Sequence, residues 1–556
     1  MRLQPTPSTR PTPRSRVADG IGRASAFLAS GTIVSRILGF VKAILLVSTI
    51  GLVGVSTDAF TIANQLPNTI YAIVAGGVLS AVLVPQIVRA GLHADGGVAY
   101  INKLVTVALV ILAGTAVLAT LLAPVLSLIL GPLLSPDQRA LVTAFAFWCL
   151  PQIFFYGLYT VLGEVLNARR SFGPYTWAPV LNNVVAIAGL ATFVLLFGAD
   201  SDGVRVASDW TPAMIAVIGG SATLGVAAQA IVLFYFWRRI GLRYRPDFRW
   251  RGVGLGSAGR MASWTFGMLV LTSLAGVVET IVVGSASGPE GNPSATALSN
   301  AWLIFMLPHS VITVSIATAY FTRMAEHVSH DRLSDLRTDV SSATRGISLI
   351  IVLAAAGLIV CAYPFSAVFS SVSFDQVQAF GNVIIAYVIG LVPFCILFVV
   401  QRTFYALGDT RTPFFFTLFQ TIVVTVLVLL CLMLPLSLTA IGIAASVSIA
   451  CILQLTLAII LLHRRLGSLD GARILRSLGK YLAAAVVPIA AGVGLLIALG
   501  GTTPGGFAVS GRFGAIISMV IIGAVMSALY AGGLLLLRSA EFRVFLDPIL
   551  ARLRRG

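Results

Sequence analysis

Five ionisable side chains lie in stretches of sequence that are otherwise almost entirely apolar. They are Arg36, Lys42, Asp58, Glu279 and His309. A charge near the centre of a bilayer costs about 2.5–3.5 kcal/mol on insertion scales, so such a residue usually faces a polar cavity or a partner. Arg36 and Lys42 fall in one stretch, and two neighbouring cations predict a cavity that receives an anion.

Arg36 and Lys42 are six positions apart, which turns their side chains about 120° from each other on an ideal helix. One of them is therefore expected to line the cavity while the other snorkels or pairs with Asp58. Gly39 lies between them and allows a bend that would widen this range. Arginine offers a phosphate a two-pronged guanidinium and lysine a point charge, so both are candidate ligands.

The two acidic residues and the histidine each have two interpretations. Asp58 is expected near the outer end of a span, as an N-cap or interfacial counter-charge, or as a contact that gates the cavity. Glu279 is a candidate site for coupling to Na⁺ or protons, or it pairs with a cation or bonds with Asn300 or Thr280. His309 is a second candidate for ion coupling, or it is hydrogen-bonded in the core.

The composition indicates an integral membrane protein. Of 556 residues 58% are hydrophobic and 10% are charged, and the mean hydropathy is +0.96. The net charge of +17 comes from short basic clusters between apolar runs, which encode membrane orientation and do not indicate a nucleic-acid partner. The five cysteines lack metal-ligand spacing, so we expect packing residues and neither a metal site nor disulfides.

An all-α fold with about fourteen transmembrane helices is predicted from the apolar runs. The spans are expected near 24–50, 57–88, 104–130, 140–166, 174–198, 211–237, 261–286, 295–322, 346–372, 377–401, 413–435, 438–462, 478–500 and 513–537. With the N-terminus inside, the loops on the outer side carry only Arg139, Arg205 and Arg512. Both termini are therefore predicted to be cytoplasmic.

An internal repeat divides the chain. The LPN motif at Pro67 recurs as LPH at Pro308, and the loop ending at Pro174 resembles the loop ending at Pro413, with nearly equal spacing. Six spans separate the copies, which predicts two six-helix lobes with a central site between them. The expected segments are a disordered basic tail (1–23), an N-lobe (24–238), a basic linker (239–260), a C-lobe (261–465), two further helices (466–540) and a basic tail (541–556).

The loop before Pro413 contains a short charged motif. Pro174 and Pro413 follow Gly173 and Thr412, which is typical of an N-cap followed by proline at the first helical position. Asp409 and Arg411 are expected to cap this cytoplasmic loop and to orient the chain.

Several motifs together resemble the MurJ (MviN) family of lipid II flippases, in the multidrug/oligosaccharidyl-lipid/polysaccharide exporter superfamily. The matching stretches are SRILGFVKA, TDAF, LPN, GGVLSAVLVP, FGPYTWAPVLNN, FYALGDTRTP and GIAASVSIA. The resemblance covers residues 24–540. It implies a V-shaped exporter with a cationic central cavity for a lipid-linked pyrophosphate and two C-terminal helices that form a groove for the lipid tail. In it, Arg36, Lys42 and Asp58 match the motif positions associated with substrate binding.

The chain departs from the family pattern at several cavity positions. Tyr71 and Ala72 stand where the family typically has paired arginines, Gly76 replaces an acidic residue, and Leu303 replaces a cavity arginine. Two of about four familiar cations remain, so Arg36 and Lys42 would carry more of the anion recognition. These departures leave open how the pyrophosphate is held and, to a smaller extent, which headgroup the substrate carries.

The leading hypothesis is a flippase for lipid II in the bacterial cytoplasmic membrane, acting in cell-wall synthesis, with no cofactor and no catalytic residues. Coupling to the membrane potential, Na⁺ or protons is open, and membrane lipids and cell-wall synthesis proteins are candidate partners. One alternative is a flippase for another lipid-linked oligosaccharide or a drug/cation antiporter of the same superfamily. A membrane glycosyltransferase fits less well, because the outer loops are short and carry no paired carboxylates with cationic support.

Overall fold

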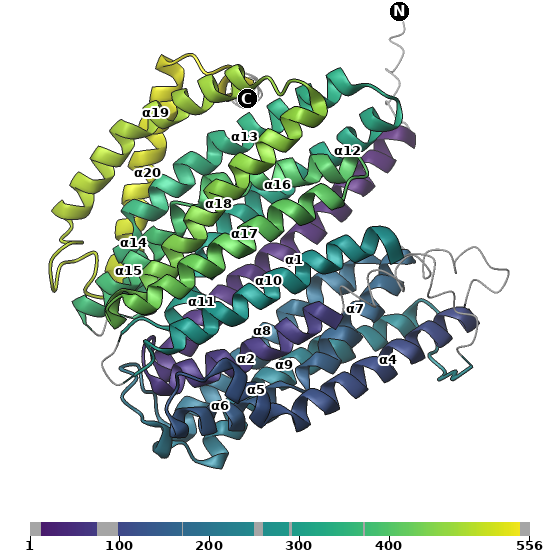
Figure 1. Ribbon diagram of the computed structural model, residues 1–556, viewed down its shortest axis with the longest axis vertical. Coiled ribbons are helices and arrows are strands. Elements are labelled where there is room, and N and C mark those ends of the chain that lie inside the picture. Colours follow the sequence, from purple (N-terminus) through teal and green to yellow (C-terminus); the bar gives the residue numbers. More distant parts are fainter. Residues whose placement is uncertain are drawn as a thin grey trace, which may run out of the picture.

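The computed structural model describes residues 13–74, 98–169, 171–249, 259–288, 292–370 and 373–544, and these residues fold almost entirely into helices (Figure 1). In chain order the elements are α1 (Pro13–Ile50), α2 (Val55–Val74), α4 (Val98–Leu121), α5 (Ala123–Leu130), α6 (Pro136–Cys149), α7 (Gln152–Ala168), α8 (Phe172–Phe197), η2 (Ala207–Asp209), α9 (Pro212–Arg239), α10 (Gly259–Gly284), α11 (Ala295–Pro308), η3 (His309–Thr313), α12 (Val314–Ser329), α13 (Leu333–Val360), α14 (Ala362–Phe369), α15 (Phe374–Val388), α16 (Leu391–Ala406), α17 (Arg411–Leu430), η4 (Cys431–Met433), α18 (Leu436–Leu466), α19 (Gly471–Ala498) and α20 (Arg512–Leu536).

Thirteen helical segments in the described part of the chain are long and apolar enough to cross a membrane. Three of these segments join consecutive helices, namely α6 with α7, α11 with α12, and α15 with α16. Together with α2 they follow the order of the fourteen expected spans. The second half of the expected span 57–88, with the GGVLSAVLVP motif and Gly76, lies outside the described residues. The count of fourteen therefore stays a prediction.

The helices form two groups that lie side by side (Figure 1). In the N-terminal group, α8 packs on α1 and α9, α2 packs on α6 and α7, and α4 packs on α7. In the C-terminal group, α17 packs on α10 and α18, and α13 and α16 pack together. α10 and α11 also contact α2, so they form the boundary between the groups. The arrangement agrees with two lobes, whose limits in the sequence remain predictions.

The last two helices attach to the C-terminal group. α19 packs on α20 and α13, and α20 packs on α14. Buried side chains from three of these helices form a separate apolar cluster that includes Leu349, Tyr481 and Tyr530. α19 and α20 lie outside the sequence repeat, and through these contacts they belong to the same folded body as the other helices (Figure 1).

Two predicted helix starts are wrong by two residues. α8 begins at Phe172 and α17 begins at Arg411, so Pro174 and Pro413 are the third residues of their helices and not the first. The first turn tolerates proline because its backbone N–H groups have no partner within the helix. The cysteine prediction is confirmed, since all five thiols are free and buried.

Candidate functional site

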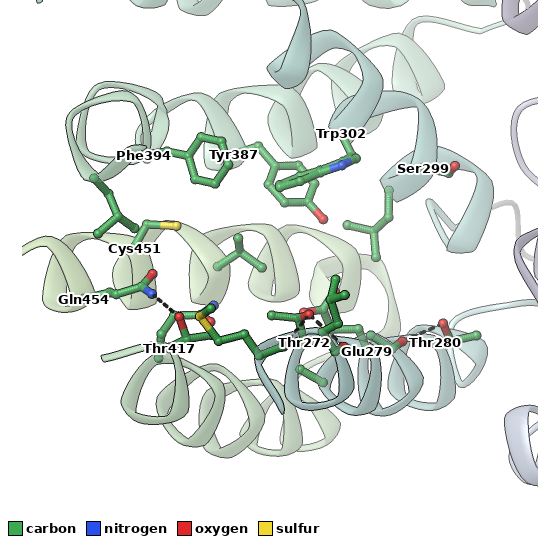
Figure 2. A pocket seen from close by; sticks show the side chains of 18 of the residues that line it. Thr272, Glu279, Thr280, Ser299, Trp302, Tyr387, Phe394, Thr417, Cys451 and Gln454 are labelled. Atoms are coloured by element: carbon green, nitrogen blue, oxygen red, sulfur yellow. Dashed lines mark hydrogen bonds between the residues drawn. The ribbon is translucent and has the colours of Figure 1, made fainter. Parts of the chain in front are cut away.

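A cavity of about 600 Å³ lies in the C-terminal group, between α10, α11 and α15 to α18. Figure 2 shows Glu279 on one wall and the rings of Trp302 and Tyr387 on the wall opposite. Gln65 of α2 also lines the cavity, so the N-terminal group contributes to it. None of the described lining residues is lysine or arginine, which leaves Glu279 as the one charged group of this wall.

The Glu279 carboxylate has no hydrogen bond or ion pair among the contacts of the described residues. Both partners expected for a structural role are engaged elsewhere. Thr280 donates to the carbonyl of Gly276 at 2.8 Å, and the amide of Asn300 donates to the carbonyl of Thr296 at 2.9 Å. A carboxylate in a cavity whose walls also carry hydroxyl and amide groups offers oxygen ligands of the kind that hard cations prefer, and it can equally take up a proton.

A second cavity of about 470 Å³ adjoins the first at the boundary between the two groups. Gln65, Thr272 and Trp302 line both cavities. Ala72, one of the positions where a family cation was expected, lies in the wall of this second cavity. The accessible space therefore continues from the C-terminal group toward α2, and its α2 wall lacks the expected positive charge at Ala72.

Arg36 lies at the boundary and contacts the opposite group. Its guanidinium donates to the hydroxyl of Ser310 in η3, a π-helical turn between α11 and α12. The side chain is partly exposed. π-Helical turns are rare and are frequently found at functional sites, so the contact places the best candidate cation against an unusual piece of backbone.

His309 occupies the core next to that contact. It is 4% exposed, and its ring packs on Phe394 and Phe398 with centroid distances of 4.7 and 5.1 Å. Its Nδ1 lies 3.6 Å from the sulfur of Cys395. His309 does not line the cavity that holds Glu279. The structure therefore favours the core interpretation, and a role in ion coupling stays a prediction.

Lys42 faces a different space. With Asn64, Gln152 and Tyr156 it lines a small cavity of about 70 Å³ inside the N-terminal group. Gln152 donates to the Asn64 carbonyl oxygen at 3.1 Å. The ion pairs of the described residues include none for Lys42, so the expected pair with Asp58 is not seen. Arg36 and Lys42 thus point to separate sites, as their spacing on α1 predicted.

Asp58 joins the two groups at the predicted outer end. Its side chain is fully buried and accepts hydrogen bonds from the hydroxyls of Ser287 and Ser294. The other oxygen accepts the backbone N–H of Thr296 at 2.9 Å. Asp58 is the fourth residue of α2, so it does not cap its own helix. It accepts a hydrogen bond from the N-terminal turn of α11 instead, and a role as a gate stays a prediction.

Further contacts close the same end. The hydroxyls of Thr61 and Thr296 lie 2.8 Å apart, and Gln138 donates to Ser287 at 3.0 Å. Within the N-terminal group, the turn before α2 packs on the loop after α8, where a Cβ on Gly203 would lie 2.1 Å from the Val53 carbonyl oxygen. Only glycine fits this approach, and φ at Gly203 is +68°. The groups are thus held together at the predicted outer end.

The loop motif before α17 makes capping contacts of the kind that were expected. Asp409 accepts the backbone N–H of Thr412 at 2.9 Å and its hydroxyl at 2.6 Å. The guanidinium carbon of Arg411 lies 5.9 Å from the Trp264 ring and 5.7 Å from the Phe415 ring. These contacts fix the start of α17 beside α10.

Some polar groups were not predicted from the sequence. Glu164 is a partly buried carboxylate in α7, inside an expected span, and an inspection of the apolar runs could have found it. Arg402 packs over Phe398 at 4.8 Å without an ion pair to a described residue. Tyr71 bonds to Thr160 at 2.5 Å inside the N-terminal group. No sequence signal marks the direction in which such side chains point.

Comparison with known families decides the identity of this arrangement. A family model described as "Lipid II flippase MurJ" matches residues 46–510, which include the walls of the two larger cavities but neither Arg36 nor Lys42. The chain belongs to the lipid II flippase MurJ family. The MurJ assignment confirms the resemblance seen in the motifs.

Curated relatives carry the same name. A "Probable lipid II flippase MurJ" of Haemophilus influenzae is 26% identical over 408 residues, which cover 69% of this chain and 75% of the relative. One of Buchnera aphidicola is 25% identical over 406 residues, covering 70% and 74%. The chain is thus a multi-pass membrane transporter of the MurJ family and not an enzyme.

Solved structures agree with the fold. A "Lipid II flippase MurJ, inward closed conformation" covers 91% of this chain and 99% of its own, with a TM-score of 0.69 and 18% identity. An inward-facing multidrug resistance MATE family transporter of the MOP superfamily covers 79% of this chain with a TM-score of 0.61 and 17% identity.

Proposed function

We propose that the protein is a flippase that moves lipid II, the undecaprenyl-pyrophosphate-linked peptidoglycan precursor, across the bacterial cytoplasmic membrane. The family match over residues 46–510 carries this proposal. The boundary cavity, closed by Asp58 at the predicted outer end, suits a carrier that loads from the cytoplasm and releases outside. Both termini are then cytoplasmic, and membrane lipids and cell-wall synthesis proteins are the expected surroundings and partners.

Arg36 is the proposed first contact of the pyrophosphate. It lies at the boundary between the groups, and its only described partner is the neutral hydroxyl of Ser310. A doubly anionic diphosphate would compete well with a hydroxyl for a guanidinium, because charge-assisted bonds are about twice as strong as neutral ones. Breaking the contact with Ser310 would then accompany substrate binding.

Glu279 is the proposed coupling group for Na⁺ or protons, since it faces the large cavity without a described partner. The membrane potential is a second source of drive. When a lipid-linked pyrophosphate moves outward at a membrane potential of 100 mV, its free energy falls by about 2.3 kcal/mol per negative charge. The two sources are separable, because only the first one depends on a side chain.

A drug/cation antiporter of the same superfamily is the second candidate. The observation that favours it is the C-terminal cavity itself, which has a carboxylate and no described cation in its walls. Against it stand α19 and α20, which pack on α13 and α14. These helices are attached to the C-terminal group, which contains the large cavity, and they offer an apolar surface for a lipid tail.

The deciding experiment replaces the essential lipid II flippase of a bacterial host with this chain. Survival with lipid II appearing in the outer leaflet supports the proposal. Death of cells in which the full-length protein accumulates in the membrane contradicts lipid II as the substrate. Protection from cationic drugs without survival would favour the antiporter.

A further inference from the structure

A basic pocket lies at the predicted inner end of the N-terminal group, away from the cavities described above. Its volume is about 600 Å³. Arg238 at the end of α9 and Arg243 and Arg245 in the following segment line it together with apolar and aromatic groups. All three arginines are exposed. The pocket combines three positive charges with an apolar floor at the end of a membrane-spanning helix.

The local sequence builds this pocket. After α9 the chain turns at Gly241, where φ is +81°, and then runs without helix along α4. Leu242 is 5% exposed, and its neighbours alternate between inward and outward positions, as in any extended segment. Leu242 and Tyr244 therefore point inward, and Arg243 and Arg245 point outward.

Hydrogen bonds hold the segment in place. The hydroxyls of Tyr244 and Thr106 lie 2.9 Å apart, and Thr106 also accepts the backbone N–H of Asp247 at 3.0 Å. The indole of Trp237 donates to the carbonyl of Leu162 at 3.1 Å. The pocket walls are thus tied to α4 and α7, so the arginines project from an ordered support.

The nearest carboxylate does not neutralise the pocket. Asp247 forms a two-pronged pair with Arg249, with both distances at 3.0 Å. The hydrogen bonds from Arg249 lower the pKa of Asp247 to about 2, so this carboxylate is ionised and already matched. The ion pairs among the described residues include none for Arg238, Arg243 or Arg245.

We propose that this pocket, formed by Arg238, Arg243 and Arg245 over Phe234, Trp237 and Leu242, binds the phosphodiester headgroup of an anionic membrane phospholipid. Arginine suits phosphate oxygens because its guanidinium is forked and always charged. Aromatic side chains at a helix end lie at headgroup depth. A soluble phosphate would use the same arginines but would gain nothing from the apolar floor.

The test measures lipid retained by the purified full-length protein in nanodiscs of phosphatidylcholine with increasing dioleoylphosphatidylglycerol. The double variant Arg243→Gln with Arg245→Gln is compared with Arg464→Gln with Arg465→Gln. The control removes the same charge at the predicted inner end of α18, outside this pocket. Because the pocket variant loses two charge-assisted contacts between arginine and the lipid phosphate, it should bind phosphatidylglycerol about thirtyfold more weakly.

The control variant should stay within threefold of the unmodified protein. Equal weakening in both variants would reduce the effect to general surface charge and overturn the proposal, and so would no weakening in either. A parallel arm adds inorganic phosphate in place of the lipid. If inorganic phosphate binds as tightly as phosphatidylglycerol, the occupant is a soluble phosphate and the lipid assignment is wrong.

Discussion

The cavities of the two helix groups are lined by groups of opposite charge. The C-terminal cavity of about 600 Å³ contains Glu279 and no described cation. The N-terminal cavity of about 70 Å³ contains Lys42 and no carboxylate. The two halves of the repeat thus differ in the size of their cavities and in the charge that lines them. A larger space with a carboxylate suits a mobile cation, whereas the small space beside Lys42 has no room for a large ligand.

Arg36 belongs to neither interior, since it lies between the two groups. We predict that Arg36→Ala abolishes lipid II export while the protein still accumulates in the membrane. Arg36→Lys should restore export only in part, because the charge remains and the fork is lost. Membrane abundance and export are measured in the same cells. Normal export by Arg36→Ala would contradict a role of this arginine in anion binding. Loss of the protein from the membrane would instead indicate that Arg36 has a structural role.

Asp58 connects the two groups, and its replacement should shift the balance between their arrangements. Asp58→Asn keeps the shape of the side chain but replaces one acceptor oxygen with an NH₂ group. At least one of the donors Ser287, Ser294 and Thr296 then loses its acceptor. We expect the outer end to open more often and export to fall about tenfold, since a lost buried bond to a charge costs about 1.5–3 kcal/mol.

The outer end is monitored by labelling a cysteine at Thr61 with a membrane-impermeant reagent, in a background without the five native cysteines. Labelling should rise several-fold in Asp58→Asn over the same background with Asp58 intact. Unchanged labelling would show that Asp58 does not hold this end closed.

A substitution of Glu279 tests whether the C-terminal cavity binds a coupling cation or proton. Glu279→Gln removes the charge and keeps the size, so export should lose its dependence on pH or Na⁺ and slow by several-fold. Dependence on the membrane potential should persist, because it acts on the substrate charge. Export is measured in vesicles with the pH gradient, Na⁺ and potential set separately. If all three dependences survive, Glu279 is a structural residue.

Lys42 tests the N-terminal half. Lys42→Met replaces a partly buried ammonium, which has no ion pair to a described residue, with an apolar chain of similar length, so the midpoint of thermal unfolding should stay equal or rise. Export should fall by less than about threefold if anion recognition lies at Arg36, since a well-formed charged bond is worth tenfold or more. A loss as complete as that of Arg36→Ala would instead locate the anion site within the N-terminal group.

The smallest effect is expected outside both interiors, where the chain after α20 is attached to α13. Glu541 pairs with Arg345 there. Burial raises the pKa of Glu541, but its backbone hydrogen bond, Arg345 and Tyr481 together outweigh burial and hold the pKa below the usual range.

A lowered folded-state pKa stabilises the protein above the unfolded pKa and loses this effect as the pH falls through the folded value. Glu541→Gln should therefore lower the unfolding midpoint by a few degrees at neutral pH, with the difference shrinking below about pH 4, near the ordinary pKa of glutamate. Unfolding is followed from pH 7 to pH 3. A difference that does not depend on pH would assign the effect to packing.

The order and extent of the helices were largely predictable, because each apolar run is long and each basic cluster is short. The divergence of Arg36 and Lys42 was predictable for the same reason, since helical geometry fixes the angle between them. The partners of Asp58 were not, because Ser287 and Ser294 come from the other group and no local pattern links them to α2. Nor does any sequence rule give the π-helical turn at His309, which depends on packing against α16.

That turn sets how the two halves of one membrane span face their neighbours. η3 covers His309–Thr313 between α11, which lines the large cavity, and α12, which packs on α13 and α16. A π-helical turn holds one residue more than an α-helical turn. Deleting one residue there would remove the extra residue and restore the regular helix, so the residues beyond it would stay nearly in phase with those before it. α12 would then keep the same row of side chains toward its neighbours, but the wide turn that presents Ser310 to Arg36 would be lost.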